Sequence, residues 1–168
     1  MAEWRRFSAS CEIGVGADVF ARVGDALSTW GIQRGSGLRV VPDSPVRLGG
    51  EHVVRIGIGR ARLNAPVHIC EIVDDDGAVH ALARRGFAYE TRDGHPEEGV
   101  EWFVVEHDLA SDRVSFVVSA TARAASWYAR LGGPVTRYLQ DMMTRRYLRA
   151  AARIASGDVS ARDARSRH

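Results

Sequence analysis

Short segments of period-two alternation, separated by turn residues, fill the middle of this chain and restrict how it can fold. In one segment Val54, Ile56 and Ile58 share one parity, so their side chains lie on one face of an extended backbone. Turn-forming residues, such as those at 74–77 and 93–96, separate neighbouring segments. The pattern predicts an antiparallel meander. The expected strands are residues 35–41, 53–58, 66–73, 79–89, 101–107 and 113–120.

Helices are expected on both sides of this region. Residues 16–30 carry apolar side chains at helical spacing, and Gly31 fits the left-handed stop after the last turn. A long helix begins at Pro134, since proline is favoured at the first helical position, and ends near Gly157. A short helix over 124–131 leads into it. The apolar stripe of the long helix consists of Val135, Leu139, Met142, Met143, Tyr147, Ala150, Ala151 and Ile154.

The order of elements predicts an α+β fold in which a curved antiparallel sheet grips the long C-terminal helix. A sheet with one apolar face must cover that face, and a helix laid in its curve does so. We expect a single domain over residues 1–157 and a polar, mobile tail over residues 158–168. A grip of this kind leaves a concave apolar cavity of the sort that small molecules occupy.

Composition excludes several classes of function. The net charge of +2 creates no strong field for polyanions, so we expect no nucleic-acid partner. Cys11 and Cys70 lie far apart without zinc-ligand spacing, which fits a reduced cytoplasm. No apolar run approaches the roughly 20 residues of a membrane span, so neither export nor membrane insertion is expected. The sequence does not indicate an oligomeric state.

Motifs for cofactors and metals are incomplete. Gly14-Val15-Gly16 lacks the third glycine of a dinucleotide-binding turn, and no phosphate-binding loop or serine nucleophile elbow occurs. The histidines and carboxylates show no metal-ligand spacing. We therefore expect no metal and no cofactor.

Two blocks of sequence resemble a family of uncharacterised bacterial and plant proteins known as a domain of unknown function. The first block reads Gly86-Phe87-Ala88-Tyr89, then Gly94-His95-Pro96-Glu97, then Gly99, Glu101 and Phe103. It is similar to the family signature GFAYGTLPGHPExGEExF. The second block, residues 129–135 with 145–148, is similar to the family's C-terminal helix. The resemblance covers residues 14–150. Glu90, Arg92 and Asp93 depart from the signature and add charge beside it, through either specialisation or drift on a strand edge.

The resemblance implies a place in the START-like, or Bet v 1-like, helix-grip superfamily. Members of that superfamily bind lipids, sterols, polyketides or hormones between sheet and helix, and some are cofactor-free cyclases, dehydratases or isomerases. The resemblance therefore implies a fold and a pocket. It transfers no catalytic residue.

Three residues of the first block are candidates for acid–base chemistry: Tyr89, His95 and Glu101. His95 has an ordinary pKa near ~6.5 and suits proton transfer, although a histidine in a turn also serves as a local hydrogen-bonding residue. Glu101 shares a face with Phe103, and a carboxyl on an apolar face has a raised pKa, unless the strand end frays and the group reaches water. Tyr89 is suited to hydrogen-bond a ligand carbonyl. Alternatively, it lines the core with its hydroxyl hydrogen-bonded within the protein.

A second group of residues is predicted to contact a flat or lipid-like ligand, although such stripes also form plain core. These residues are Phe87, Trp102, Phe103, Tyr138 and Met142. On the third strand, alternation puts His68, Cys70 and Ile72 on one face and Glu71 on the other.

The function predicted first is binding of a small apolar molecule of lipid, polyketide or isoprenoid type. The first alternative is a cofactor-free cyclase, dehydratase or isomerase acting in the same cavity. The second alternative is an interaction module that uses the arginine-rich C-terminal end, residues 145–167.

Overall fold

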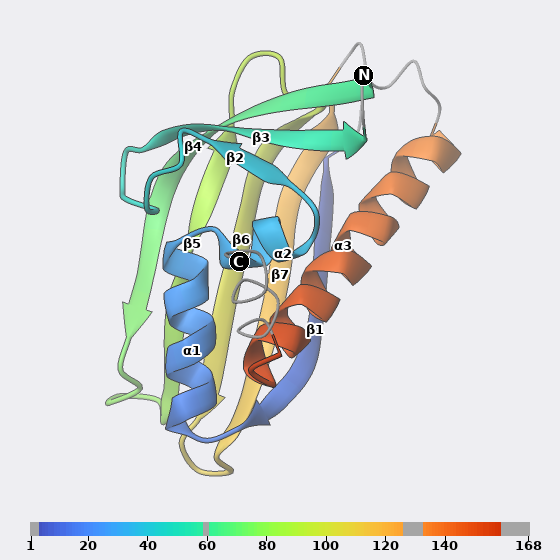
Figure 1. Ribbon diagram of the computed structural model, residues 1–168. Helices are drawn as coiled ribbons and strands as arrows, with labels where there is room; N and C mark the ends of the chain where they lie inside the picture. Colours follow the sequence, from blue (N-terminus) through green and yellow to red (C-terminus); the bar gives the residue numbers. More distant parts are fainter. Residues whose placement is uncertain (1–3, 59–60, 126–132, 159–168) are drawn as a thin grey trace, which may run out of the picture.

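In the part of the chain that the structure describes, alternating apolar and polar residues build seven strands, which form one antiparallel sheet in the order β1-β7-β6-β5-β4-β3-β2 (Figure 1). The structure is a computed structural model that describes residues 4–58, 61–125 and 133–158. Its strands are β1 (Arg5–Val15), β2 (Arg39–Val41), β3 (Glu51–Ile58), β4 (Ala61–Asp75), β5 (Leu82–Thr91), β6 (Glu97–Asp108) and β7 (Arg113–Ala124). From β2 to β7 each strand pairs with the next along the chain, which confirms the predicted meander.

The first strand, β1, was not predicted, since the first element expected from the sequence is the helix over residues 16–30. Residues 5–15 alternate exposed with partly buried positions, and Phe7, Cys11 and Ile13 lie on the covered side. The apolar side of β1 is short and broken by small residues, so its sequence signal is weak. The strand β1 is hydrogen-bonded into the sheet by pairing with β7, where Phe7 lies opposite Ala120 and Cys11 opposite Phe116.

The predicted first helix is divided into α1 (Ala17–Ser28) and α2 (Gly31–Gly35). Trp30, not Gly31, adopts the left-handed conformation, with a φ of 61°. Its indole is fully buried, and this burial offsets the conformational cost. At Gly31 a Cβ atom would lie 2.8 Å from the carbonyl oxygen of Ala26, so close approach requires glycine there. Because α2 continues to Gly35, the following strand is only Arg39–Val41.

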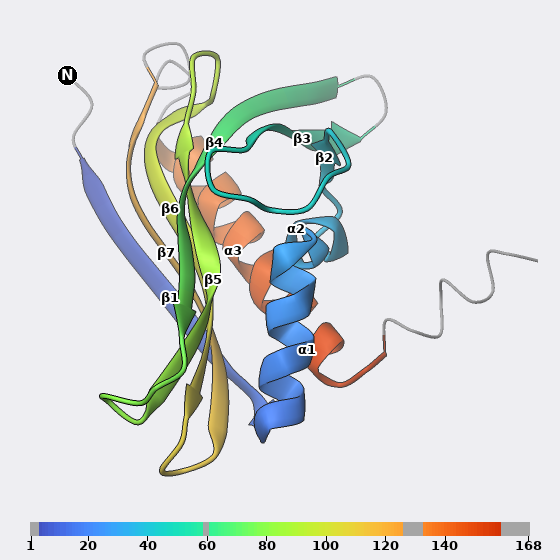
Figure 2. The same ribbon diagram turned by 90° about the vertical axis from the view of Figure 1, so that its left-hand side faces the viewer.

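The long helix α3 (Gly133–Ala155) lies in the curve of the sheet, on the same side as α1 (Figure 2). Its buried face consists of Tyr147, Ala150, Ala151, Ile154 and Ala155, with Thr144 beside them. This arrangement confirms the predicted α+β fold in which a curled antiparallel sheet grips a C-terminal helix. Residues 126–132 and 159–168, which include most of the predicted short helix and tail, lie outside the described residues.

Aromatic side chains connect the layers. Phe87 packs edge-on against Trp30 at 5.1 Å between ring centroids and stacks on Phe103 at 5.6 Å. Phe103 in turn meets the ring of Tyr147 edge-on at 5.0 Å. These ring contacts form a contiguous core between α2, the central strands and α3. Tyr147 belongs to this core and also lines the cavity described below.

A bulge in β4 changes the predicted faces of that strand. The register with β5 shifts between Ile69, opposite Tyr89, and Glu71, opposite Ala88. The extra residue, Cys70, interrupts the alternation, so His68, Cys70 and Ile72 do not form one continuous face. Periodicity alone could not locate this shift, since it appears only when both strands are paired.

None of the described helices is long and apolar enough to cross a lipid bilayer.

Candidate functional site

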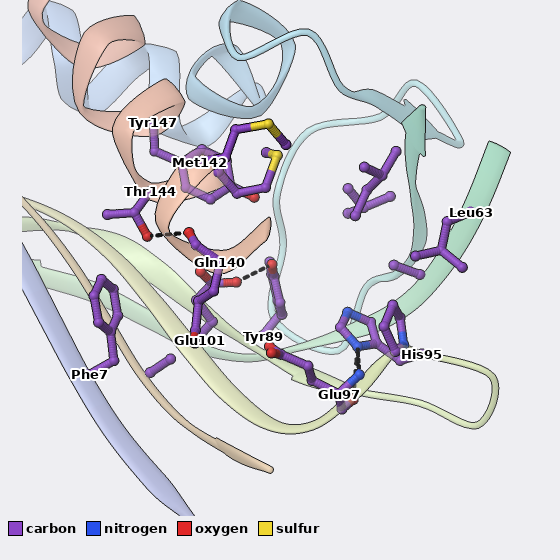
Figure 3. Close-up of a pocket in the computed structure, with 16 residues that line it drawn as sticks. Phe7, Leu63, Tyr89, His95, Glu97, Glu101, Gln140, Met142, Thr144 and Tyr147 are labelled. Atoms are coloured by element: carbon purple, nitrogen blue, oxygen red, sulfur yellow. Dashed lines mark hydrogen bonds between the residues drawn. The ribbon is translucent and has the colours of Figure 1, made fainter. Parts of the chain in front are cut away.

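A cavity of about 130 Å³ lies between the inner face of the sheet and α3 (Figure 3). Its walls are mainly apolar, with polar groups gathered on β5, β6, the turn between them, and α3. The apolar lining residues are Phe7, Val54, Ile56, Leu63, Ala65, Pro96, Ala120, Met142 and Met143. The polar lining residues are Tyr89, His95, Glu97, Glu101, Gln140, Thr144 and Tyr147.

Tyr89 and Glu101 form the central polar pair of the cavity. They lie directly opposite each other on β5 and β6, so strand pairing puts both side chains on the inner face. The Tyr89 hydroxyl donates a hydrogen bond to Oε2 of Glu101 at 2.5 Å. This hydrogen bond is charge-assisted whenever Glu101 is ionised.

Glu101 titrates near neutrality. Its pKa is raised from 4.5 to about 7: burial is the main cause, the hydrogen bond from Tyr89 opposes it, and the negative charge of Glu97 adds a smaller increase. At neutral pH the carboxyl therefore exists in both protonation states, and it can accept or release a proton without a large free-energy cost.

Tyr147 extends this pair from the side of α3. Burial raises the pKa of Tyr147 well above 10, and the charge of Glu101 adds to the effect, while hydrogen bonding with Tyr89 opposes it. Burial likewise raises the pKa of Tyr89 well above its usual value. Both hydroxyls therefore stay protonated, so each can donate one hydrogen bond and accept another.

His95 belongs to the turn between β5 and β6 and is held by the backbone. Its Nδ1 lies 3.0 Å from the backbone nitrogen of Glu97 and 2.8 Å from that residue's carbonyl oxygen. Burial lowers the pKa of His95 to about 4, and the hydrogen bond to Glu97 only partly opposes this. The imidazole is therefore neutral at physiological pH.

Glu97 follows His95 at the start of β6 and adds a second carboxyl to the lining. Burial raises its pKa. It lies on the same face of the strand as Glu101, four residues away. Among the described residues no arginine lines the cavity.

The structure brings together four of the eight residues predicted for the site: Tyr89, His95, Glu101 and Met142. Phe87 and Phe103 lie next to them in the core, with the Phe103 ring 5.6 Å from Tyr89, but do not line the cavity.

Trp102 and Tyr138, which are predicted to contact a ligand, do not line this cavity. Trp102 follows Glu101 on β6, so strand alternation turns it to the outer face of the sheet, where its Nε1 donates to Glu71 at 3.0 Å. Tyr138 lies on α3 with 69% of its surface exposed. Trp127 and Tyr128 are outside the described residues.

Sequence reasoning missed Glu97 and Tyr147 as site residues. Both occur in the two blocks quoted for the family resemblance, but the sequence indicated no role for Glu97 and placed Tyr147 in the apolar stripe of the long helix. Within the described residues, no three His, Cys, Asp or Glu side chains gather closely enough to hold a metal ion.

Comparison with known proteins agrees with this fold. The sequence pattern that defines a domain of unknown function, DUF1990, matches residues 2–150. None of the curated proteins matches the chain.

Solved structures with the same architecture share little sequence with this chain. A hypothetical protein from Helicobacter pylori has a TM-score of 0.61 at 12% identity, covering 91% of this chain and 88% of its own. The major latex-like protein 151 of Panax ginseng has a TM-score of 0.55 at 15% identity, with 92% and 97% covered. A norcoclaurine synthase mutant from Thalictrum flavum, solved with a transition-state analogue, has a TM-score of 0.52 at 13% identity, with 90% and 96% covered. At these identities the likeness establishes the helix-grip fold.

Proposed function

Since this chain belongs to the DUF1990 family, whose description assigns no activity, we propose a function from the site itself: the protein binds one small, mainly apolar molecule between the sheet and α3. The observation that carries this proposal is the cavity, whose apolar walls end in one cluster of hydrogen-bonding groups (Figure 3).

The size of the cavity indicates the size of the ligand. An apolar protein cavity of about 150 Å³ holds a benzene molecule, so a volume of about 130 Å³ suits a single ring or a short branched chain. Longer lipids would need the side chains of Met142 and Met143 to move, which the unbranched methionine side chain does readily.

The polar cluster supplies orientation. Tyr89, Glu101 and Tyr147 meet at one part of the wall, so a ligand with one polar group would place that group there and its apolar body against Val54, Ile56 and Leu63. Sites with mainly apolar walls and a few converging polar groups are typical of small-molecule binding.

The test combines native mass spectrometry with a variant that fills the cavity. Ala120→Phe introduces a ring into the lining, whereas Ser119→Phe introduces the same ring at the neighbouring position on the outer face. We expect the wild type and Ser119→Phe to retain a small molecule, recovered by organic extraction or added from a library of ring compounds, and Ala120→Phe to lose it. Equal retention by folded Ala120→Phe protein would contradict binding in this cavity.

A second candidate function is proton-transfer catalysis without a cofactor, supported by the Glu101 carboxyl, whose pKa is about 7, beside the Tyr89 hydroxyl. A carboxyl with this pKa can act as general acid or general base at neutral pH. Glu101 would move the proton, and Tyr89 would stabilise the charge that develops on a ligand oxygen. The class of reaction would be an isomerisation, dehydration or cyclisation.

The enzymatic candidate requires turnover. The molecule recovered from the protein, or a ring compound found to bind, is incubated with wild type and with Glu101→Gln at equal occupancy, and products are followed by mass spectrometry. Product formation that disappears in Glu101→Gln would support catalysis. An unchanged ligand in both samples would leave binding as the function.

A further inference from the structure

The charges that face the cavity are all of one sign. Two carboxyls, Glu97 and Glu101, line it, and no arginine does so among the described residues. The one imidazole in the lining, His95, is neutral at physiological pH. When these carboxyls are ionised, they create a negative potential between low-dielectric walls, which attracts cations and repels anions.

Arginines near these carboxyls are paired on the opposite face of the sheet. Glu98, next to Glu97, faces outward and binds Arg123 through two hydrogen bonds, the one from Nε being 2.8 Å long. Arg92 in the preceding turn contacts Glu90 at 3.1 Å and Glu51 at 3.4 Å. The outer carboxylates thus have cationic partners within the protein, whereas no arginine is among the described residues that line the cavity with Glu97 and Glu101.

The two cavity carboxyls lie at different positions along β6. Four residues of extended chain separate them, a span of about 13 Å. Glu101 lies beside Tyr89 and Tyr147 at the polar end of the cavity, whereas Glu97 adjoins the turn that carries His95. Glu101 is therefore the direct contact for a ligand, and Glu97 contributes to the potential around it.

Building on the binding function proposed above, we propose that the ligand is a protonated amine on an apolar body of about one ring, whose ammonium group binds the carboxyl of Glu101 and the hydroxyl oxygens of Tyr89 and Tyr147. A primary ammonium group has three N–H donors, and these three side chains offer three acceptor groups. Hydrogen bonds between an ammonium group and a carboxylate are charge-assisted and stronger than neutral ones. Neither hydroxyl has to ionise.

Ionisation of Glu101 accompanies binding. Because the pKa of Glu101 is about 7, this carboxyl is ionised in roughly half of the protein molecules at neutral pH. The incoming cation favours the ionised form. Below pH 7 the amine binds with release of one proton from Glu101 to solvent. The groups that face Glu101 are Tyr89 from β5, Glu97 from β6, Tyr147 from α3 and the neutral His95, so no positive side chain of the described lining competes with the ligand.

Three probes of nearly equal shape test this inference: benzylamine, benzyl alcohol and benzoate, which are cationic, neutral and anionic. Their dissociation constants are measured at pH 8 by NMR titration of the whole chain, with signals of cavity residues such as Met142 confirming the place of binding. We expect benzylamine to bind at least about tenfold more tightly than benzyl alcohol, and benzoate to bind most weakly.

Variants identify the carboxyl responsible. Glu101→Gln keeps the size of the side chain and an oxygen that accepts from Tyr89, and it should remove the preference for the amine over the alcohol. Glu97→Gln should reduce that preference by only a few-fold. The matched control, Glu98→Gln, changes a carboxyl on the same strand that faces outward, and it should retain the full preference.

The pH series tests the same point in the wild type, even if Glu101→Gln fails to fold. Below pH 7 the dissociation constant of benzylamine should rise by up to about tenfold per pH unit, while that of benzyl alcohol should stay constant.

The outcomes separate the two proposals. Binding of benzyl alcohol or benzoate in the cavity as tightly as benzylamine would overturn the amine inference and leave the binding function standing. An amine preference that persists in folded Glu101→Gln, or that is independent of pH, would also overturn it. Failure of all three probes to shift the cavity signals would count against the binding function and the inference together.

Discussion

Tyr89 and Glu101 are cross-strand partners whose side chains meet in the cavity, with the phenol hydroxyl 2.5 Å from the carboxyl oxygen. Two opposing effects determine the pKa of the Glu101 carboxyl. Burial destabilises the carboxylate, and the phenol hydrogen bond stabilises it. The first predictions follow from this balance.

Replacing Tyr89 with phenylalanine should raise the pKa of Glu101 above about 7, because the hydrogen bond that favours the ionised carboxyl is removed while burial remains. Carbon-detected NMR titration of the Glu101 carboxyl measures this directly. Tyr138→Phe is the control, since Tyr138 is exposed and should leave the titration unchanged. A lower pKa in Tyr89→Phe would contradict the assigned hydrogen bond.

Glu101 should make the protein less stable as pH rises. Its folded-state pKa, about 7, is above its ordinary value of 4.5, so the folded state holds the proton more tightly than the unfolded state. The resulting stabilisation is complete below about pH 4.5 and is lost as the pH rises through 7. Glu101→Gln removes this dependence, so its free energy of unfolding relative to wild type should increase between pH 5 and 8 by up to about 3 kcal/mol.

Urea unfolding at several pH values measures that difference. Comparison with wild type cancels the contributions of titrating groups that do not interact with Glu101. A difference between the two proteins that stays constant from pH 5 to 8 would show that Glu101 titrates normally.

His95 should make the protein less stable as the pH falls, which is the opposite of the effect of Glu101. Its folded-state pKa of about 4 lies below its ordinary 6.5, because burial disfavours the imidazolium. Stability is therefore lost as the pH falls from about 6.5 to about 4, by up to about 3 kcal/mol. In NMR spectra the ring signals of His95, assigned by their absence in His95→Gln, should keep their neutral positions down to about pH 5. A titration midpoint near 6.5 would contradict burial of the ring.

The neighbouring residues Phe103 and Trp102 test the assignment of strand faces. Phe103 is fully buried and touches Phe87, Tyr89 and Tyr147. Phe103→Ala should therefore destabilise the protein by about 3–5 kcal/mol through the cavity it leaves. Trp102→Ala removes a larger side chain but on the outer face, together with one hydrogen bond to Glu71, and should cost roughly 1 kcal/mol.

Chemical denaturation of the two variants at one pH provides the comparison. Equal losses of stability would mean that the alternation along β6 is not as described. Because the residues are adjacent and both aromatic, differences in local strand propensity have little influence on the result.

The sequence allowed much of the fold to be predicted, because hydrophobic periodicity is local. The alternation at Val54, Ile56 and Ile58 and the stripe ending at Ile154 each depend only on residues near in the chain, and both elements are present. The strand β1 and the short helix α2 were not found. β1 joins the sheet by pairing with β7, about a hundred residues away in the chain, and α2 begins directly after Trp30, whose ring packs against Phe87.

The residues of the candidate site likewise fall into those that the sequence could predict and those that it could not. Tyr89, His95 and Glu101 could be proposed from the family signature and from the parity of two strands joined by one turn. Tyr147 could not, because its approach to Tyr89 and Phe103 depends on how α3 lies across the sheet. Trp102 was proposed as a ligand contact because it is aromatic. The alternation along β6 turns its side chain to the outer face, where it binds Glu71.

The sequence by itself determined the order of the strands from β2 to β7 and of the long helix α3, the turn at Gly94-His95, and the shared face of Glu101 and Phe103. These features arise from interactions over a few residues, which sequence order specifies directly. Tertiary structure alone decided the bulge at Cys70, the left-handed Trp30, and the enclosure of Glu97, Glu101 and Tyr147 around one cavity. Burial, and with it the raised pKa of Glu101, depends on residues distant in the chain, so no local pattern could have revealed it.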